Sequence, residues 1–281
     1  MREIAQRARV LVTPTFALCL LRFAFCLSAS TFCLRSSALP QSPAGLGEAD
    51  RVAAAVVQLV AIGPGQGEKN RACSATGFLV NEEGYILTNA HVVEDARRCL
   101  AGSSEAKILA KLAPGRSGTG LAASESSTAT AVSCDVVAVD DVHDLAVLKP
   151  ERPLPQDPAG GPRPFALLNP REVPDGAAVT VTGHPLFVWQ PTTQTGKILR
   201  RARLRLSDES PEASDVLVLD IPLKPGNSGS PVYLRSTGAV VGVVERQNGS
   251  NRSESVAVPV RYAVEMLDRL GIKWYGASNS P

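Results

Sequence analysis

The segment 226–231 reads Gly-Asn-Ser-Gly-Ser-Pro, and it follows the segment 220–225, Asp-Ile-Pro-Leu-Lys-Pro. Ser228 therefore stands between two glycines. A serine hydroxyl is a weak nucleophile until a base accepts its proton, and a glycine two residues earlier lets backbone N–H groups point at a developing oxyanion. Because Gly, Asn, Ser and Pro also build ordinary surface turns, the segment fits either a nucleophile loop or a structural turn.

Two further polar residues lie in apolar segments that precede this loop. His91 belongs to the run YILTNAHVV at 85–93, which predicts a strand that ends at the imidazole. Histidine is the usual general base near neutral pH, and a rigid strand end would hold it in place. Asp144 opens the next apolar run, 144–149, and its carboxylate could accept a hydrogen bond from His91. Base, carboxylate and nucleophile thus follow one another as His, Asp, Ser; the alternative is three structural residues.

The other two histidines are weaker candidates for catalysis. His143 is next to Asp144, and neighbours on a strand point to opposite faces, so we expect His143 to face away from the site. His184 precedes Pro185 in a predicted turn, where a structural role and a role in a substrate cleft both remain open.

These segments resemble the catalytic blocks of the chymotrypsin-fold (trypsin-like) serine proteases, and most of all the bacterial HtrA/Deg-like group. The resemblance spans residues 52–270. It implies an all-β fold of two antiparallel β-barrels of the chymotrypsin type with a short C-terminal helix. The motifs that carry it occur in the same order as in that group: 74–80, 85–93, 144–148, 183–186, 194–199, 220–231 and 256–260.

The resemblance also implies a role for each candidate residue. His91 would be the general base, Asp144 the residue that orients it, and Ser228 the nucleophile. The backbone N–H groups of Gly226 and Ser228 would form the oxyanion hole. Two departures concern the pocket: Ser230 replaces a usual glycine, and the segment 245–247, Glu-Arg-Gln, is more charged than is usual there.

The resemblance further predicts the substrate pocket, from Pro222, Leu223, Val243 and Glu245. Pro222 stands six residues before Ser228, where relatives that cleave after Lys or Arg carry a carboxylate. An apolar floor cannot compensate a buried cation, so small or medium aliphatic residues should be preferred before the scissile bond. Glu245 leaves this open, because a carboxylate at the pocket wall would favour basic side chains instead.

Composition predicts the domain organisation. Short Val-rich runs separated by many of the 23 glycines and 21 prolines favour an all-β barrel or sandwich, and only Arg261 to Leu270 shows helical spacing. The segment 114–130 is predicted to be a mobile insertion. The chain ends at Pro281, which predicts no PDZ domain. The expected parts are a leader at 1–38, a flexible entry at 39–51, a first barrel at 52–149, a Pro-rich linker at 150–164, a second barrel with its helix at 165–270, and a tail at 271–281.

The leader has the pattern of a secretory signal. Basic residues at its start precede an apolar run, 10–34, and then small residues. The alternative is an uncleaved membrane anchor. It is the weaker choice, because Arg22 interrupts the run and would be costly at a bilayer centre. Removing 1–38 takes five of 29 basic and one of 27 acidic residues, leaving 24 and 26. This near-neutral balance gives no reason to expect a nucleic-acid partner.

Cysteine usage fits export. In chymotrypsin-like folds the regions of Cys73 and Cys99 are neighbours, so the resemblance implies a disulfide between them; three buried thiols are the alternative. Cys134 would then be left over, either buried or free. No Cys-x-x-Cys or histidine cluster suggests a metal site, and no cofactor is expected.

Together these observations predict a secreted or periplasmic serine endopeptidase that cleaves proteins or peptides through an acyl-enzyme. Membrane contact is expected only if the leader is uncleaved, and the sequence does not indicate an oligomeric state. The alternative is a catalytically inactive protease-fold module that binds peptides or unfolded proteins. An esterase is disfavoured, because its Gly-x-Ser-x-Gly elbow comes with the order Ser, Asp, His.

Overall fold

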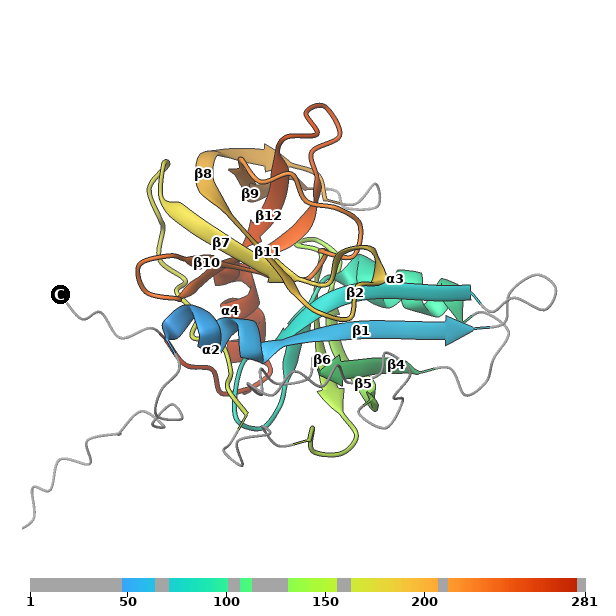
Figure 1. The fold of residues 1–281 in the computed structure, drawn as a ribbon. Helices are drawn as coiled ribbons and strands as arrows, with labels where there is room; N and C mark the ends of the chain where they lie inside the picture. Colours follow the sequence, from blue (N-terminus) through green and yellow to red (C-terminus); the bar gives the residue numbers. More distant parts are fainter. Residues whose placement is uncertain are drawn as a thin grey trace, which may run out of the picture. The chain divides into compact units, whose positions relative to one another are not determined.

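The structure is a computed structural model that describes residues 47–63, 71–100, 107–112, 131–155, 163–206 and 212–276. These residues form two closed barrels of six antiparallel strands each, as Figure 1 shows. The predicted all-β fold of two antiparallel barrels with a C-terminal helix is confirmed. The predicted leader and the predicted insertion at 114–130 lie outside the described residues.

The first barrel has the strand order β1-β2-β3-β6-β5-β4, and β1 pairs with β4 to close it. Leu, Val, Ile and Ala side chains on these strands fill its interior. Strand β4 illustrates this arrangement: its residues alternate between buried and half-buried, because successive side chains of a strand point to opposite faces. The strands are β1 Val56–Gly63, β2 Arg71–Leu79, β3 Ile86–Thr88, β4 Ile108–Leu112, β5 Ala131–Asp140 and β6 Leu145–Pro150.

The second barrel has the strand order β10-β11-β12-β9-β8-β7 and closes between β7 and β10. A 3-10 turn, η2 Pro185–Phe187, follows its first strand. The loop that carries Ser228 connects β9 to β10. The strands are β7 Ala178–Gly183, β8 Thr192–Leu204, β9 Ser214–Leu219, β10 Pro231–Leu234, β11 Val240–Gln247 and β12 Ser255–Pro259.

Three apolar clusters make up the core. Each barrel encloses one of its own. The largest lies between the barrels, where Phe78 and Leu145 of the first pack with Tyr233 and Val243 of the second, all at most 1% exposed. This shared core holds the two barrels in a fixed relation, so residues of different barrels can form one site.

Three helices are described, α2 Glu48–Ala55, α3 Ala90–Cys99 and α4 Val260–Arg269. The prediction that helical spacing occurs only near the C-terminus was therefore wrong. Residues 48–51, expected to end a flexible entry segment, begin α2. None of the described helices is long and apolar enough to cross a membrane.

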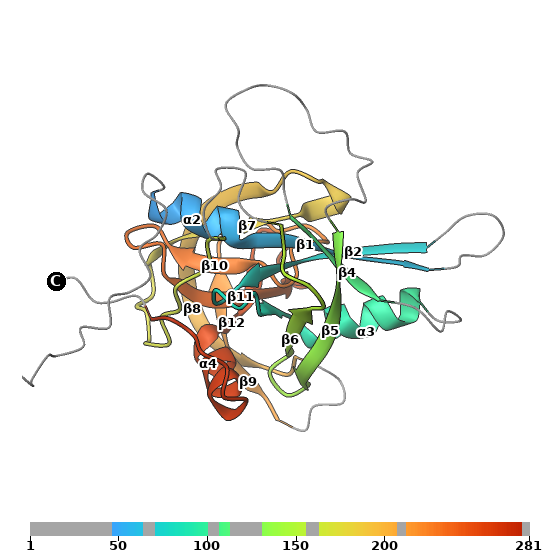
Figure 2. The same ribbon diagram turned by 90° about the horizontal axis from the view of Figure 1, so that it is seen from below.

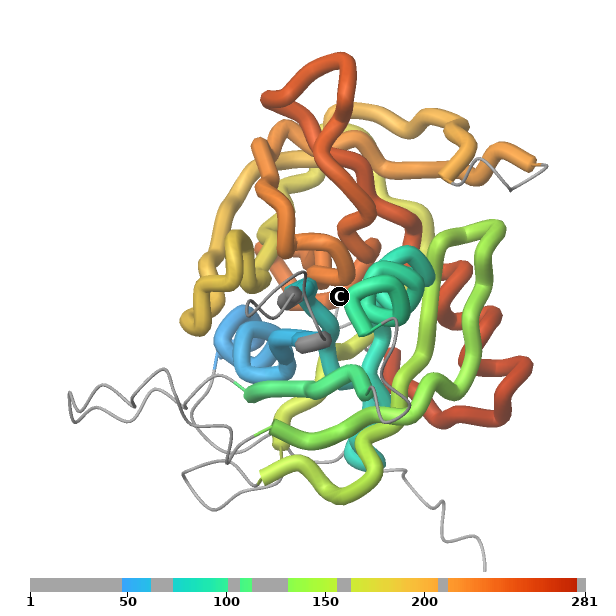
Figure 3. Tube along the Cα trace, turned by 90° about the vertical axis from the view of Figure 1, so that its right-hand side faces the viewer, coloured from blue at the N-terminus to red at the C-terminus, as the bar shows by residue number. Residues whose placement is uncertain are grey.

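Helix α3 corrects the predicted strand at 85–93. Strand β3 ends at Thr88, Asn89 occupies the N-cap position, and the helix begins at Ala90. A short apolar run does not distinguish a strand from a buried helix, and the valines here belong to the helix face formed by Val92, Val93, Ala96 and Cys99. Figures 1 and 2 show α3 beside β2, and Figure 3 shows it near the meeting of the barrels.

Candidate active site

His91 and Asp144 are joined by two hydrogen bonds. The backbone N–H of His91 donates to Asp144 Oδ1 at 2.8 Å, and His91 Nδ1 lies 2.7 Å from Asp144 Oδ2. Asn89 fixes the aspartate from the other side by donating to its backbone carbonyl at 2.9 Å. One carboxylate therefore holds both the helix start and the imidazole ring, which leaves His91 Nε2 free to exchange a proton.

Local backbone geometry places both residues differently from the prediction. His91 lies in the first turn of α3 and not at a strand end. Asp144 lies in a turn just before β6 with a φ of 51°, a left-handed conformation that Asp tolerates better than most residues. Residues held in such conformations are often found at functional sites.

The electrostatics of His91 favour the imidazolium. Burial lowers its pKa, but the hydrogen bond and charge of Asp144, together with the charges of Glu245 and Asp95, raise the pKa above its ordinary value. Since a general base must be neutral to accept a proton, this shift moves the acid limb of any His91-dependent reaction to higher pH.

The loop around Ser228 is shaped by two glycines with positive φ. Gly226 has a φ of 98° and Gly229 a φ of 83°, and a Cβ on Gly229 would lie 2.0 Å from the backbone oxygen of Thr76. Among the described residues, no hydrogen bond uses the N–H of Gly226 or of Ser228. These two donors are thus available to a ligand.

Thr76 of β2 connects this loop to the first barrel, a role that the sequence did not reveal. Its N–H donates to the carbonyl of Ser228 at 2.9 Å, and its hydroxyl donates to the carbonyl of Gly226 at 2.7 Å. The same hydroxyl accepts the N–H of His184 at 3.0 Å. Nothing in the sequence distinguishes Thr76 from an ordinary strand threonine, because its partners are more than 100 residues away.

Thr76→Val is expected to lower kcat by about 10- to 100-fold, because the Gly226 carbonyl and the His184 N–H lose their partner and the loop shifts. Peptide hydrolysis and urea unfolding would be compared with those of Thr180→Val, because Thr180 is a buried threonine of the second barrel. If both variants retained full kcat, Thr76 would not position the loop.

The Ser228 hydroxyl donates to the backbone carbonyl of Glu245 at 3.0 Å. Among the described residues it makes no hydrogen bond to His91. Ser228 and His91 nevertheless line the same cleft, of about 320 Å³, with Gly226. A rotation about the Cα–Cβ bond of Ser228 would release its hydroxyl from the Glu245 carbonyl.

The four predicted pocket residues do not line this cleft. Leu223 is 2% exposed inside the second barrel, and Val243 is 0% exposed in the core between the barrels. Pro222 is exposed. Glu245 lies within strand β11, and its carboxyl group lies beside His91 and Asp144.

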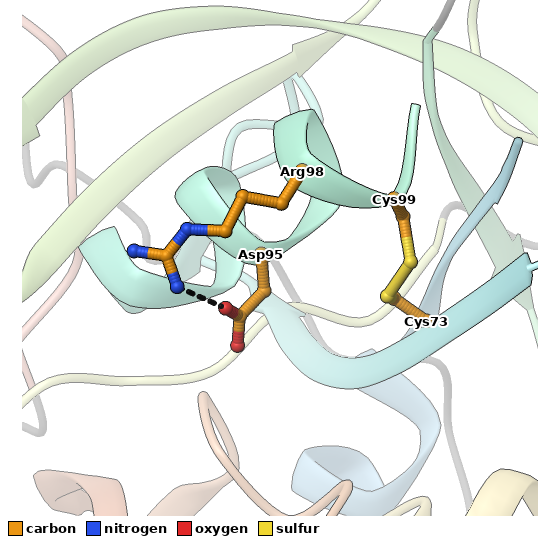
Figure 4. The surroundings of a disulfide bond; sticks show 4 residues. All are labelled: Cys73, Asp95, Arg98 and Cys99. Carbon is orange, nitrogen blue, oxygen red and sulfur yellow. Dashed lines mark hydrogen bonds and ion pairs between the residues drawn. A yellow bond between two sulfur atoms is a disulfide. The ribbon is translucent and has the colours of Figure 1, made fainter. Parts of the chain in front are cut away.

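The disulfide joins Cys73 of β2 to Cys99 at the end of α3, as Figure 4 shows. Asp95 and Arg98 pair on the same helix in this view. The disulfide ties the helix that carries His91 to the first barrel. Cys134 is a buried free thiol whose pKa burial raises to about 12.

The remaining histidines lie outside the His91–Asp144 pair. His143 lies in a turn, not on a strand; its Nδ1 is 2.9 Å from Asp140 Oδ2, and its ring stacks on Tyr262. His184 is fully buried, and burial lowers its pKa to about 4, so it is neutral at pH 7. Its contact with Thr76 makes it a support of the Ser228 loop.

We assign no metal site to the described residues. In the described ranges, His91, Asp144 and Glu245 are the single group of three or more His, Cys, Asp or Glu side chains whose ligand atoms all lie within 4.8 Å of one another. The facing atoms of His91 and Asp144 already share a hydrogen bond.

Comparison with known proteins defines the class. The family model described as the trypsin-like peptidase domain matches residues 75–243. Because this match covers more than half of the chain, the protein belongs to the trypsin-like peptidase family. The range contains His91, Asp144 and Ser228.

Within that family the chain is similar to Deg proteins. It is 30% identical over 207 residues to a protein of Chlamydia trachomatis serovar D named "Probable periplasmic serine endoprotease DegP-like", which covers 72% of this chain and 35% of that protein. It is 27% identical over 202 residues to the serine endoprotease DegS of Escherichia coli K12, covering 69% and 47%. The chain thus spans less than half the length of these relatives.

Solved structures agree on the fold. The Rv3671c protease of M. tuberculosis in its active form matches with a TM-score of 0.60 at 20% identity, covering 86% of this chain and 98% of that one. A serine endoprotease from Yersinia pestis matches with a TM-score of 0.54 at 22% identity, covering 82% and 68%.

Proposed function

We propose that the protein is a serine endopeptidase in which His91, Asp144 and Ser228 form the catalytic triad. One observation carries this proposal: His91, held by two hydrogen bonds with Asp144, lines the same cleft as Ser228, whose loop presents two unused N–H groups. Base, orienting carboxylate, nucleophile and oxyanion donors are the parts that acyl transfer requires.

In the proposed reaction the Ser228 hydroxyl leaves the Glu245 carbonyl, gives its proton to His91 Nε2 and attacks the substrate carbonyl carbon. The N–H groups of Gly226 and Ser228 stabilise the oxyanion. His91 then returns the proton to the leaving amine, which leaves an acyl-enzyme, and a water molecule activated by His91 hydrolyses this ester. Asp144 accepts the hydrogen bond of His91 Nδ1–H throughout, stays ionised and stabilises the imidazolium.

The substrates we propose are proteins or peptides. The cleft that holds Ser228 is lined mostly by apolar side chains, among them Leu59, Val92 and Ile108, so we propose a preference for small or medium aliphatic residues before the scissile bond. Export is supported by the leader-like sequence and by relatives named periplasmic.

A fluorophosphonate probe tests the activated nucleophile. The folded protein should be labelled at Ser228, because only a serine with an adjacent base attacks the probe at a useful rate. Mass spectrometry of the labelled peptide gives the site, and Ser228→Ala together with urea-denatured protein serves as control. Failure of the folded protein to react would favour the non-catalytic, peptide-binding alternative.

A further inference from the structure

Glu245 is a buried carboxyl group on the opposite barrel from His91 and Asp144. Only 4% of the residue is exposed. The pairing of β11 with β12 shifts register between Val244 and Arg246, so Glu245 is the extra residue of a β-bulge. Bulges redirect a side chain and are frequent beside active sites.

The Glu245 side chain meets charged groups from three elements. Its Oε1 bonds the guanidinium of Arg246 on the same strand. Its other oxygen, Oε2, is buried without a hydrogen-bond partner. Carboxyl or imidazole atoms of Asp144, from the turn before β6, and of His91, on α3, lie within 4.8 Å. An unpartnered buried oxygen is costly, and this one lies beside the pair that carries the proton.

We propose that Glu245 is a positioning residue for the catalytic base, a second carboxyl group whose protonation state sets the charge on His91. The proposal rests on the function proposed above. Asp144 acts on the imidazole through a hydrogen bond. Glu245 acts on it through the electrostatic field of its charge, because its side-chain hydrogen bond is with Arg246.

The energetics give the direction of the effect. Burial, together with the charge of Asp144, raises the pKa of Glu245 to about 7, against the lowering influence of Arg246 and His91. Below that pH Glu245 is neutral and His91 is stabilised by Asp144 and Asp95 alone; above it a second anion supports the imidazolium. Since His91 becomes imidazolium in the transition state, ionised Glu245 should speed the reaction.

His91 titration in the full-length protein without substrate is the decisive measurement. Histidine-labelled protein is followed by NMR from pH 5 to 9, and the His91 signal is identified by its loss in His91→Gln. In Glu245→Gln the His91 pKa should fall by roughly one unit, and the second inflection near pH 7 should disappear. Glu265→Gln, an exposed carboxylate on α4, is the matched control and should change neither.

Arg246→Gln provides a second variant that keeps the carboxyl group. Without the guanidinium, Glu245 retains its proton to higher pH, so the second inflection should move upward. In hydrolysis, Glu245→Gln should lower kcat about three- to tenfold at pH 8 with KM unchanged, and move the acid limb to lower pH.

An unchanged His91 titration in Glu245→Gln, or in Arg246→Gln if the first variant does not fold, would overturn the proposal. Because the titration needs no substrate, a shifted His91 pKa in a protein that hydrolyses nothing would retain the role of Glu245 and reject the peptidase function.

Discussion

Ser228→Ala and His91→Ala are each expected to lower the turnover number by about 10⁴-fold or more, because nucleophile and base act as one unit. The double variant should be little worse than either single variant. Turnover would be measured with a peptide substrate at the pH optimum of the unmodified enzyme. Substantial hydrolysis by Ser228→Ala would refute the assignment of the nucleophile.

Asp144→Asn separates the orienting role from folding. Asn also tolerates the positive φ of this position, and its amide can keep one of the two contacts with His91. The protein should therefore fold, yet lose roughly 10⁴-fold in kcat, because the amide favours the wrong tautomer of His91.

Replacing both Cys73 and Cys99 with alanine is expected to lower the free energy of unfolding by about 3 to 4 kcal/mol. The disulfide closes a loop with a sequence separation of 26, and its loss gives that loop back its freedom in the unfolded chain. The urea midpoint of the double variant would be compared with that of the oxidised wild type.

Cys134→Ala is the control for this experiment, because it removes a buried thiol and leaves the disulfide. Reduction should shift the midpoint of Cys134→Ala and not that of the double variant. Equal midpoints for the double variant and oxidised wild type would show that the bridge adds no stability.

The turn at Ser228 was predictable because two glycines mark it in the local sequence. Gly226 and Gly229 both take positive φ, and they stand in the sequence where such residues are needed. The barrels were predictable for a similar reason, since Val-rich runs separated by Gly and Pro match the observed strands. The helix α3 was not, because Val92 and Val93 extend an apolar run without a break at Asn89.

The placement of Glu245 could not be predicted from its neighbours. Strand β11 is buried from Val240 through Glu245, so it shows no alternation from which a side-chain direction could be inferred. The bulge that redirects Glu245 depends on pairing with β12, and its neighbours His91 and Asp144 come from the other barrel. The role of Thr76 could not be predicted either, because its hydrogen-bond partners also come from the other barrel.

The hydrogen bonds of Thr76 make the proposed catalytic site depend on both barrels, although each barrel is a closed set of strands. If the two barrels were expressed as separate chains, each would keep a complete sheet. The proposed oxyanion hole would be lost, because the Ser228 loop of one half is held by hydrogen bonds from a strand of the other. Activity in such a split protein would return only with reassembly, and would report the contact between the halves.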